Sequence, residues 1–278
     1  MPNVYDCFPV YNEFDMVDLR IETLHGQVDM HVGVLASLTH AGNDNTHVSR
    51  WVTETREHLT LYVHDERDRR DGIPATRRRE MNQRNAIINA LQSLPANEQP
   101  LPNDIILISD ADEIPNPAIV AQLWKEGLPE GVVVIFRQRL CYYDLNTTQG
   151  YVWQGTRAVR WDDLRALSPH VVRYGLGAHD EHYPKYGLAM PGGWHLSYFG
   201  GAERVREKMI NFLHQELVND DVADAVKIAA RIAAGDDIYG RSESQWTVER
   251  TTDVPPPVLA SPERWRHLWR PGYEPEGE

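Results

Sequence analysis

Three carboxylates stand close together directly after a short apolar run. The run covers residues 105–108 and is preceded by Pro102, and Asp110, Asp112 and Glu113 follow it. Four apolar residues between polar ones are typical of a strand that is buried on both faces of a sheet. Because ligands of open α/β sheets bind beyond the carboxyl ends of the strands, we expect these side chains to face a substrate.

The spacing of these carboxylates suits a divalent cation. Asp110 and Asp112 lie two residues apart, which places both side chains on one side of an extended segment. Carboxylates suit Mg²⁺ or Mn²⁺, which keep coordination positions for water and phosphate oxygens. The pattern predicts a nucleotide-sugar site. The alternative is a solvated strand end or a helix cap, since Asn116 and Pro117 suit the first positions of a helix over 118–125.

Residues 192–201, Gly-Gly-Trp-His-Leu-Ser-Tyr-Phe-Gly-Gly, form a second informative stretch. Glycines flank a short strand, and apolar spacing predicts a helix from about Ala202. His195 within the strand is either a core histidine with satisfied hydrogen bonds or a metal ligand. Glu203 falls in the first turn of the helix, where the helix dipole favours a carboxylate. It is either a helix-start charge or a catalytic base.

The chain before the acidic cluster alternates between strands and helices. Residues 4–10, 28–35 and 59–63 are typical of strands, and apolar residues recur at helical spacing between them. Asn12 and Glu13 follow the first strand, so they are candidate contacts for a base or ribose, or else caps of the next helix. The helix before the acidic strand carries Arg84 near its start. This alternation predicts an α/β fold.

Two features downstream point to a sugar. Tyr143 lies in a segment that mixes aromatic rings with polar tips, and such surfaces suit sugar rings, although buried core tyrosines look the same. Residues 131–137 and 153–157 are expected to be strands, and Gly155 marks a point where something approaches the backbone closely. We therefore regard Gly155 as a candidate donor contact and Trp194 as a candidate sugar platform.

Composition excludes some classes of function. The chain has 41 acidic and 28 basic residues and a formal charge of −13, so it should repel nucleic acid and anionic membranes. Two cysteines, Cys7 and Cys141, do not make a disulfide scaffold and fit a reducing compartment. No apolar stretch is long enough for a membrane span, and the first residues lack the regions of a signal peptide. We expect a cytoplasmic protein.

The 278 residues allow one large domain with a C-terminal extension. A last helix over 222–234 should end at Gly235. From Pro255 the chain is rich in proline and carries Trp265 and Trp269, which predicts a strap packed on the domain before an acidic tail over 274–278. We therefore divide the chain into a domain over 1–240 and a strap with an acidic tail over 241–278.

Taken together, these motifs resemble glycosyltransferase family 17, the family of the β-1,4-mannosyl-glycoprotein 4-β-N-acetylglucosaminyltransferase. The resemblance extends over most of the chain, and the order of its Asp-Ala-Asp-Glu-Ile-Pro and Gly-Trp-His segments is specific. The segments that carry it are residues 6–24 with Tyr-Asn-Glu and Leu-Arg, Gln83-Arg84, Ile-Ser-Asp-Ala-Asp-Glu-Ile-Pro at 108–115, Trp-Gln-Gly-Thr at 153–156, Gly-Trp-His-Leu-Ser-Tyr at 193–198, and residues 212–216.

The resemblance implies a GT-A fold, a Rossmann-like mixed sheet flanked by helices. It also implies inverting transfer from a UDP-sugar, expected to be UDP-N-acetylglucosamine, to a glycan hydroxyl. The roles assigned on this basis are metal ligands for Mn²⁺ or Mg²⁺ (Asp110, Asp112, Glu113, His195), donor contacts (Asn12, Glu13, Arg84, Asp110, Gly155, Trp194), and a base that is Glu203 first and Glu216 second.

Two departures and two rival functions accompany this expectation. Residues 35–42 lack the Glu that relatives often carry at the end of the second strand, and the animal enzymes are membrane-anchored whereas this chain shows no anchor. A nucleotidyltransferase would normally show a glycine-rich basic loop near the first strand, which residues 9–13 do not form. A sugar-binding protein without turnover is the other rival. The acceptor and the oligomeric state are not specified by the sequence.

Overall fold

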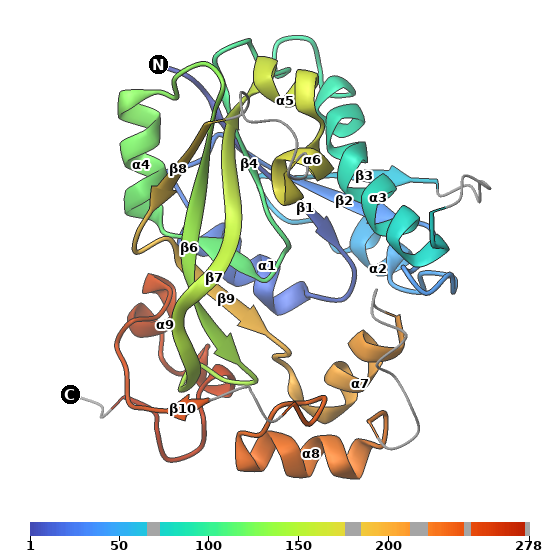
Figure 1. Ribbon diagram of the computed structural model, residues 1–278, viewed down its shortest axis with the longest axis vertical. Coiled ribbons are helices and arrows are strands. Elements are labelled where there is room, and N and C mark those ends of the chain that lie inside the picture. The colour runs from blue at the N-terminus through green and yellow to red at the C-terminus, as the bar shows by residue number, and fades with distance from the viewer. Residues whose placement is uncertain (66–72, 176–184, 212–221, 242–245, 276–278) are drawn as a thin grey trace.

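A computed structural model describes residues 1–65, 73–175, 185–211, 222–241 and 246–275 (Figure 1). Its elements alternate between strands and helices in the first half of the chain. In order they are β1 (Val4–Val10), α1 (Phe14–Thr23), β2 (Met30–Ala36), α2 (Val48–Thr53), β3 (Leu59–His64), α3 (Ala75–Gln92), β4 (Ile105–Ile108), β5 (Glu113–Pro115), α4 (Pro117–Glu126), β6 (Val132–Tyr142), β7 (Thr147–Arg160), α5 (Trp161–Leu167), α6 (Pro169–Tyr174), β8 (Lys185–Ala189), β9 (Gly193–Ser197), α7 (Gly201–Asn211), α8 (Ala225–Ala234), β10 (Thr247–Val248), α9 (Pro256–Ala260) and the 3₁₀ helix η2 (Arg266–Leu268).

Within the described residues the strands form one mixed sheet in the order β3-β2-β1-β4-β7-β6-β9-β5, with β8 beside β6 and β10 beside β7. The first four strands of this order are parallel, whereas β7 runs antiparallel to both β4 and β6. The registers pair Cys7 with Ile108 and Val10 with Leu35. The carboxyl ends of β1, β2 and β4 therefore lie at one edge, where the acidic cluster follows β4.

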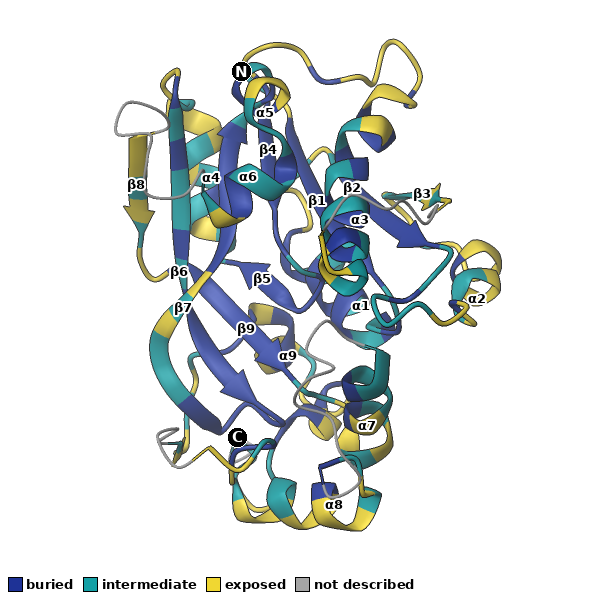
Figure 2. Ribbon diagram, turned by 45° about the vertical axis from the view of Figure 1, so that its right-hand side comes forward, coloured by how far each residue is buried: buried dark blue, intermediate teal, exposed yellow. Residues whose placement is uncertain are grey.

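Apolar side chains alternate between the two faces of the parallel strands, as the two-residue period of a strand requires. Ile106 and Ile108 pack with Ile87 and Leu91 of α3, whereas Ile105 and neighbouring residues pack on the face covered by α1 and α4. The strand is fully buried on both sides, as its unbroken apolar run indicated. Helices therefore cover both faces, which confirms the expected α/β class (Figure 2).

A short antiparallel pairing attaches the acidic cluster to the second half of the sheet. β5 pairs with β9, and this register sets Glu113 opposite His195. Gly193, in β9, has a φ of +112°, and a Cβ there would lie 2.2 Å from the Ile114 carbonyl oxygen. Only glycine fits this position, because the backbone of β5 approaches it so closely. The two stretches singled out in the sequence therefore meet.

The C-terminal segment packs on the domain instead of extending away from it. Trp265 and Trp269 are buried in one cluster with Met16 of α1 and Trp194 of β9. Figure 1 shows this segment beside the lower part of β6, β7 and β9. The part of the segment around Trp265 and Trp269 is therefore packed on the domain. In the part of the chain that the structure describes, helices that are both long and apolar enough to cross a bilayer are absent.

The helix ends also follow the sequence. Asn116 caps α4 by accepting a hydrogen bond from the backbone N–H of Ala118, and Pro117 is its first residue. The expected cap at Asn116 is thus real, and it exists together with the acidic cluster instead of replacing it. α8 ends at Gly235, which adopts the left-handed conformation.

Candidate functional site

A cavity of about 670 Å³ lies beyond the carboxyl ends of β1, β2 and β4. Residues of these ends and of α3 and α6 line one part of it, and β6, β7, β9, α7 and the segment around Trp246 line the other. Its size falls in the range of about 300–1,000 Å³ that is usual for ligand sites. Asp110, Asp112 and His195 all line it. The cavity is therefore the candidate site.

The acidic segment turns sharply instead of continuing in an extended conformation. The backbone N–H of Glu113 donates to the carbonyl oxygen of Asp110 at 3.0 Å. The backbone N–H of Asp110 in turn donates to Oε2 of Glu113 at 3.0 Å. Our expectation of an extended segment at Asp110 and Asp112 is therefore wrong, although both aspartates line the cavity. The turn instead gives the two aspartates different partners.

Asp110 faces two buried arginines. Its Oδ1 accepts from Arg84 at 3.0 Å, and its Oδ2 lies 3.6 Å from Arg173. Burial alone would raise the pKa of Asp110, but the charges of Arg84 and Arg173 outweigh burial and hold this pKa well below its usual range. Asp110 is therefore an anion throughout the ordinary pH range. Arg84 lines the cavity as expected, although its guanidinium is already bound by Glu80 and Asp110.

Glu113 is completely buried, and both oxygens of its carboxylate accept hydrogen bonds within the protein. Its Oε1 accepts from Arg173 and from the indole N–H of Trp153, and its Oε2 accepts from the turn. Among the described residues that line the cavity, Glu113 is absent. The geometry thus does not support Glu113 as a metal ligand, because its hydrogen bonds are made within the protein. It positions Arg173 and the turn.

Asp112 divides its carboxylate between two different groups. Its Oδ2 accepts from the ammonium of Lys208 at 2.7 Å, and its Oδ1 lies 3.6 Å from Nε2 of His195. Burial lowers the pKa of His195 further than Asp112 and Glu113 raise it, so the imidazole is neutral at neutral pH. Among the described residues, Nδ1 of His195 has no hydrogen-bond partner. A carboxylate oxygen and a neutral imidazole nitrogen therefore face each other in the cavity.

This pair fits a divalent cation that takes its remaining ligands from a substrate. Within the described ranges, groups of three or more His, Cys, Asp or Glu side chains arranged to hold a metal are absent. Ions such as Mg²⁺ are nevertheless often held by one or two protein groups together with substrate phosphates and water. Asp112 and His195 offer such a partial set. Of the four ligands expected from the sequence, the structure brings these two together.

Lys208 of α7 is a functional candidate that sequence reasoning missed. Burial would lower the pKa of its ammonium, but Asp112 and Glu13 outweigh burial and raise it, so Lys208 stays charged. The lysine lies 96 residues from Asp112 in the chain. Patterns within one segment cannot predict such a pair. The sequence did indicate which face of α7 packs against the domain, because Val205 and Met209 form an apolar stripe that is buried in the structure.

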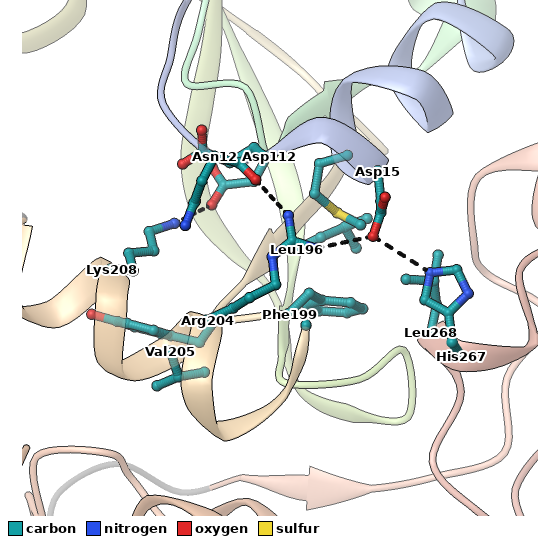
Figure 3. Close-up of a pocket in the computed structure, with 14 residues that line it drawn as sticks. Asn12, Asp15, Asp112, Leu196, Phe199, Arg204, Val205, Lys208, His267 and Leu268 are labelled. Atoms are coloured by element: carbon teal, nitrogen blue, oxygen red, sulfur yellow. Dashed lines mark hydrogen bonds and ion pairs between the residues drawn. The ribbon is translucent and has the colours of Figure 1, made fainter. Parts of the chain in front are cut away.

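The loop after β1 lies at the border of the large cavity and a smaller one. Asn12 lines only the smaller cavity (Figure 3). Its side chain donates to Glu207 of α7 at 2.7 Å. Glu13 lines both cavities, and burial raises its pKa even though Lys208 acts in the opposite direction. Glu13 is therefore placed to meet a ligand directly. Asn12 instead fixes the loop to α7.

Two expected donor contacts lie away from the cavity. A Cβ on Gly155 would lie 1.5 Å from the side-chain oxygen of Gln138, so the close approach predicted for this glycine comes from a core glutamine and not from a ligand. Trp194 is buried in the cluster beneath the C-terminal strap and donates its indole N–H to Asp253. Tyr143 is likewise buried, with its hydroxyl on the Asp236 carbonyl. These residues stabilise the fold.

Neither of the two carboxylates expected to act as the catalytic base, Glu203 and Glu216, is among the described residues that line the cavity. Glu203 is exposed in the first turn of α7 and is not among the described residues that line either cavity. The geometry therefore does not support Glu203 as the base, because the helix directs Lys208 and not Glu203 to the cavity. Glu216 lies outside the described residues, so it stays a prediction.

Aromatic side chains line the end of the cavity away from β2 and α3. Trp246 stacks on Tyr142 with ring centroids 4.1 Å apart, and the hydroxyls of Tyr198 and Tyr239 are 2.7 Å apart. Arg241 lies over the ring of Tyr239. Sequence reasoning chose Tyr143 and Trp194 for this role, whereas the cavity uses Tyr142 and Trp246.

A known protein family matches most of this chain. The family model described as glycosyltransferase family 17 matches residues 1–251 of the 278. This range includes the acidic turn, His195, Lys208 and the aromatic end of the cavity. Curated proteins gave no match.

Proposed function

The chain belongs to glycosyltransferase family 17, and from this premise we propose that it transfers N-acetylglucosamine from UDP-N-acetylglucosamine to a glycan hydroxyl with inversion and with the help of a divalent cation. A sugar donor and an acceptor follow from the family itself. The observation that carries the proposal is the close approach of the Asp112 carboxylate to the His195 imidazole beyond the carboxyl ends of the parallel strands.

The charges around the acidic turn support the need for a cation. Among the described residues there, the five carboxylates of Glu13, Glu80, Asp110, Asp112 and Glu113 outnumber the four cationic side chains of Arg84, Arg157, Arg173 and Lys208. Arg20 also contacts the turn, but Asp6 balances its charge. Arg84 and Arg173 are already held by carboxylates. A diphosphate entering this region would meet a net negative charge. Repulsion between like charges at short distance costs several kcal/mol where water is excluded. A divalent cation would remove this penalty.

Asp112 and His195 are the residues that would hold this cation. When bound, it would offset the negative charge that develops on the departing UDP. The protein's own part is to fix the two ligands: β5 and β9 pair at Glu113 and His195, and the backbone N–H of Leu196 donates to the Asp112 carbonyl at 2.8 Å. Both ligands are therefore held by the backbone of adjacent segments.

The two ends of the cavity support different occupants. The end at β1, β2 and α3 is lined by polar groups such as Thr39, Gln83 and Arg84, which suit a nucleotide. The opposite end presents Tyr142, Tyr239 and Trp246, whose apolar faces suit a sugar ring. We place the donor at the polar end and the acceptor at the aromatic end, on either side of Asp112.

Inversion requires a carboxylate that takes the proton of the attacking hydroxyl. Glu216 remains our candidate from the sequence. Of the described cavity carboxylates, Asp110 is a poor base because its pKa is strongly depressed. The pKa of Glu13 is raised by burial, which makes this group the better proton acceptor near neutral pH. Comparing Glu216→Gln with Glu13→Gln at saturating donor tests which carboxylate acts.

Release of UDP from UDP-N-acetylglucosamine tests the proposal. Wild-type protein should release UDP slowly in Mn²⁺ without an acceptor, faster when an acceptor is present, and not after chelation of the metal. UDP-glucose and GDP-mannose serve as donors that the proposed specificity should disfavour. Binding of saccharides without any UDP release would instead assign the chain to the sugar-binding class.

A further inference from the structure

Lys208 occupies a position that the proposed function does not explain. Its ammonium contacts Oδ2 of Asp112, the oxygen that does not face His195 (Figure 3). The Asp112 side chain is only 6 % exposed, so its charge is poorly screened by water. A lysine so close to a metal ligand should weaken metal binding. Lys208 should therefore have a function that offsets this loss of metal affinity.

We propose that Lys208 makes binding of the divalent cation depend on the nucleotide diphosphate. This inference rests on the proposed function. Before the donor binds, Lys208 neutralises Asp112, so the pair of Asp112 and His195 attracts a cation only weakly. The donor's diphosphate then supplies the negative charge that Asp112, neutralised by Lys208, does not offer to the cation. Lys208 lies beside the diphosphate as a positive charge in addition to the cation.

The geometry allows Lys208 to act without leaving Asp112. The two oxygens of the carboxylate serve different partners, with the lysine on Oδ2 and the imidazole near Oδ1. The helix that carries the lysine is anchored by Val205 and Met209, both fully buried. The ring centroid of Tyr198 also lies 5.6 Å from the ammonium. Lys208 therefore has a fixed place between the acidic turn and the end of β9.

The location of Lys208 also gives it access to a ligand. It lines both the large cavity and the smaller one, together with Glu13 and Asp112. In Figure 3 the lysine extends from α7 toward Asp112, across the space that separates α7 from the loop after β1. The arginines nearby are bound by Glu80, Asp110 and Glu113. Lys208 shares its carboxylate with a candidate metal position, and the arginines do not.

The test measures Mn²⁺ affinity by electron paramagnetic resonance, with and without UDP, in the wild type and in Lys208→Met. Without UDP, the variant should bind Mn²⁺ at least about tenfold more tightly, because Asp112 is no longer neutralised. With saturating Mn²⁺, it should bind UDP more weakly. The factor by which UDP and Mn²⁺ favour each other should therefore fall, and linkage requires the same factor in both directions.

Two further variants keep the test decisive. Lys125→Met removes an equal charge from the exposed last turn of α4 and should leave both affinities unchanged. Lys208→Arg should bind Mn²⁺ more weakly than the wild type, since a guanidinium can hold both oxygens of Asp112. Lys208→Arg retains the ion pair with Asp112. If Lys208→Met does not fold, the Mn²⁺ affinity of Lys208→Arg tests the role of Lys208, and an affinity equal to that of the wild type would refute it.

Failure of this inference and failure of the proposed function look different. If the wild type shows mutual enhancement of Mn²⁺ and UDP binding while Lys208→Met behaves like Lys125→Met, the role of Lys208 is refuted and the proposed function stands. If wild-type protein binds no UDP at any Mn²⁺ concentration, the proposed function itself is refuted.

Discussion

Asp110 and Asp112 are the same residue type two positions apart, yet their surroundings give them different chemistry. Arg84 and Arg173 hold Asp110 as a permanent anion inside an ion-pair network. Asp112 faces a neutral imidazole and an ammonium. The turn between them causes this difference. In our account, Asp112 is the aspartate that meets the cation, and Asp110 fixes the arginines of the cavity wall.

The position of Glu203 leads to a prediction at the same scale. We expect Glu203→Gln to retain transfer activity within about threefold of wild type, because its exposed side chain lies off the cavity and a surface change of this kind usually alters stability by less than about 0.5 kcal/mol. Initial rates at saturating donor measure this. A loss of a hundredfold or more would restore Glu203 as the base and refute our placement of the reacting centre.

Among the secondary-structure elements, β1 is joined to α1 and to the acidic turn through one buried arginine. Arg20 of α1 donates through Nε to Asp6 of β1 at 2.6 Å, and through Nη1 to the Glu113 carbonyl at 2.8 Å. His31 of β2 contacts the same aspartate at 2.8 Å. Asp6, Arg20 and His31 are all buried. This network sets the acidic turn against the first parallel strands.

Removal of Asp6 should destabilise the protein. We expect Asp6→Asn to lower the free energy of unfolding at pH 7 by about 3–5 kcal/mol, because Arg20 is left as a buried charge without its carboxylate. Urea unfolding measures this. Glu54→Gln, which breaks the exposed pair with Arg50, is the control and should cost at most about 1 kcal/mol. Equal effects in both variants would contradict the role of the buried network.

The same network predicts how this difference depends on pH. Burial would raise the pKa of Asp6, but Arg20 and His31 outweigh burial and lower this pKa from 3.8 to about 2. A carboxylate with a lowered folded-state pKa stabilises the protein above its ordinary pKa, and this contribution is lost as the pH falls toward 2. The advantage of wild type over Asp6→Asn should therefore shrink by about 2 kcal/mol between pH 5 and pH 2.

The elements were largely predictable from the sequence, and the partners of the site residues were not. β1 and β4 are buried on both faces, so their apolar runs identify them without other information. The turn at Asp110 has no such signature, since the same residues are compatible with an extended segment. Arg173 and Lys208 come from helices far along the chain, and only the tertiary fold brings them to the acidic turn.

For the whole molecule, the C-terminal strap completes the core on which the site rests. From Pro255 onward it lies beyond the range matched by the family model, which ends at residue 251. Trp265, Leu268 and Trp269 are nevertheless buried against Met16 and Trp194. The backbone N–H of Leu145 donates to the Leu268 carbonyl at 2.9 Å. The strap therefore belongs to the folded unit and supports β9, which carries His195.

Truncation tests this role of the strap. We expect removal of residues 255–278 to abolish cooperative folding, because each large apolar side chain contributes about 1.5–3 kcal/mol on burial and a whole domain is stable by only about 5–15 kcal/mol. Thermal unfolding followed by circular dichroism measures this. Glu263→Gln, a change at an exposed side chain of the same segment, is the control and should leave the melting temperature unchanged. A truncated chain that melts like wild type would contradict the account.

Calorimetric binding of UDP-N-acetylglucosamine, with and without Mn²⁺, tests the central claim most directly when wild type is compared with Asp112→Ala. We expect wild type to bind the donor only with Mn²⁺, and Asp112→Ala to lose this binding while remaining folded. Loss of the carboxylate removes the proposed cation ligand, whose Oδ1 lies 3.6 Å from Nε2 of His195. Equal binding by the two proteins, or binding by wild type that is indifferent to Mn²⁺, would contradict the assignment of Asp112 to a metal-dependent donor site.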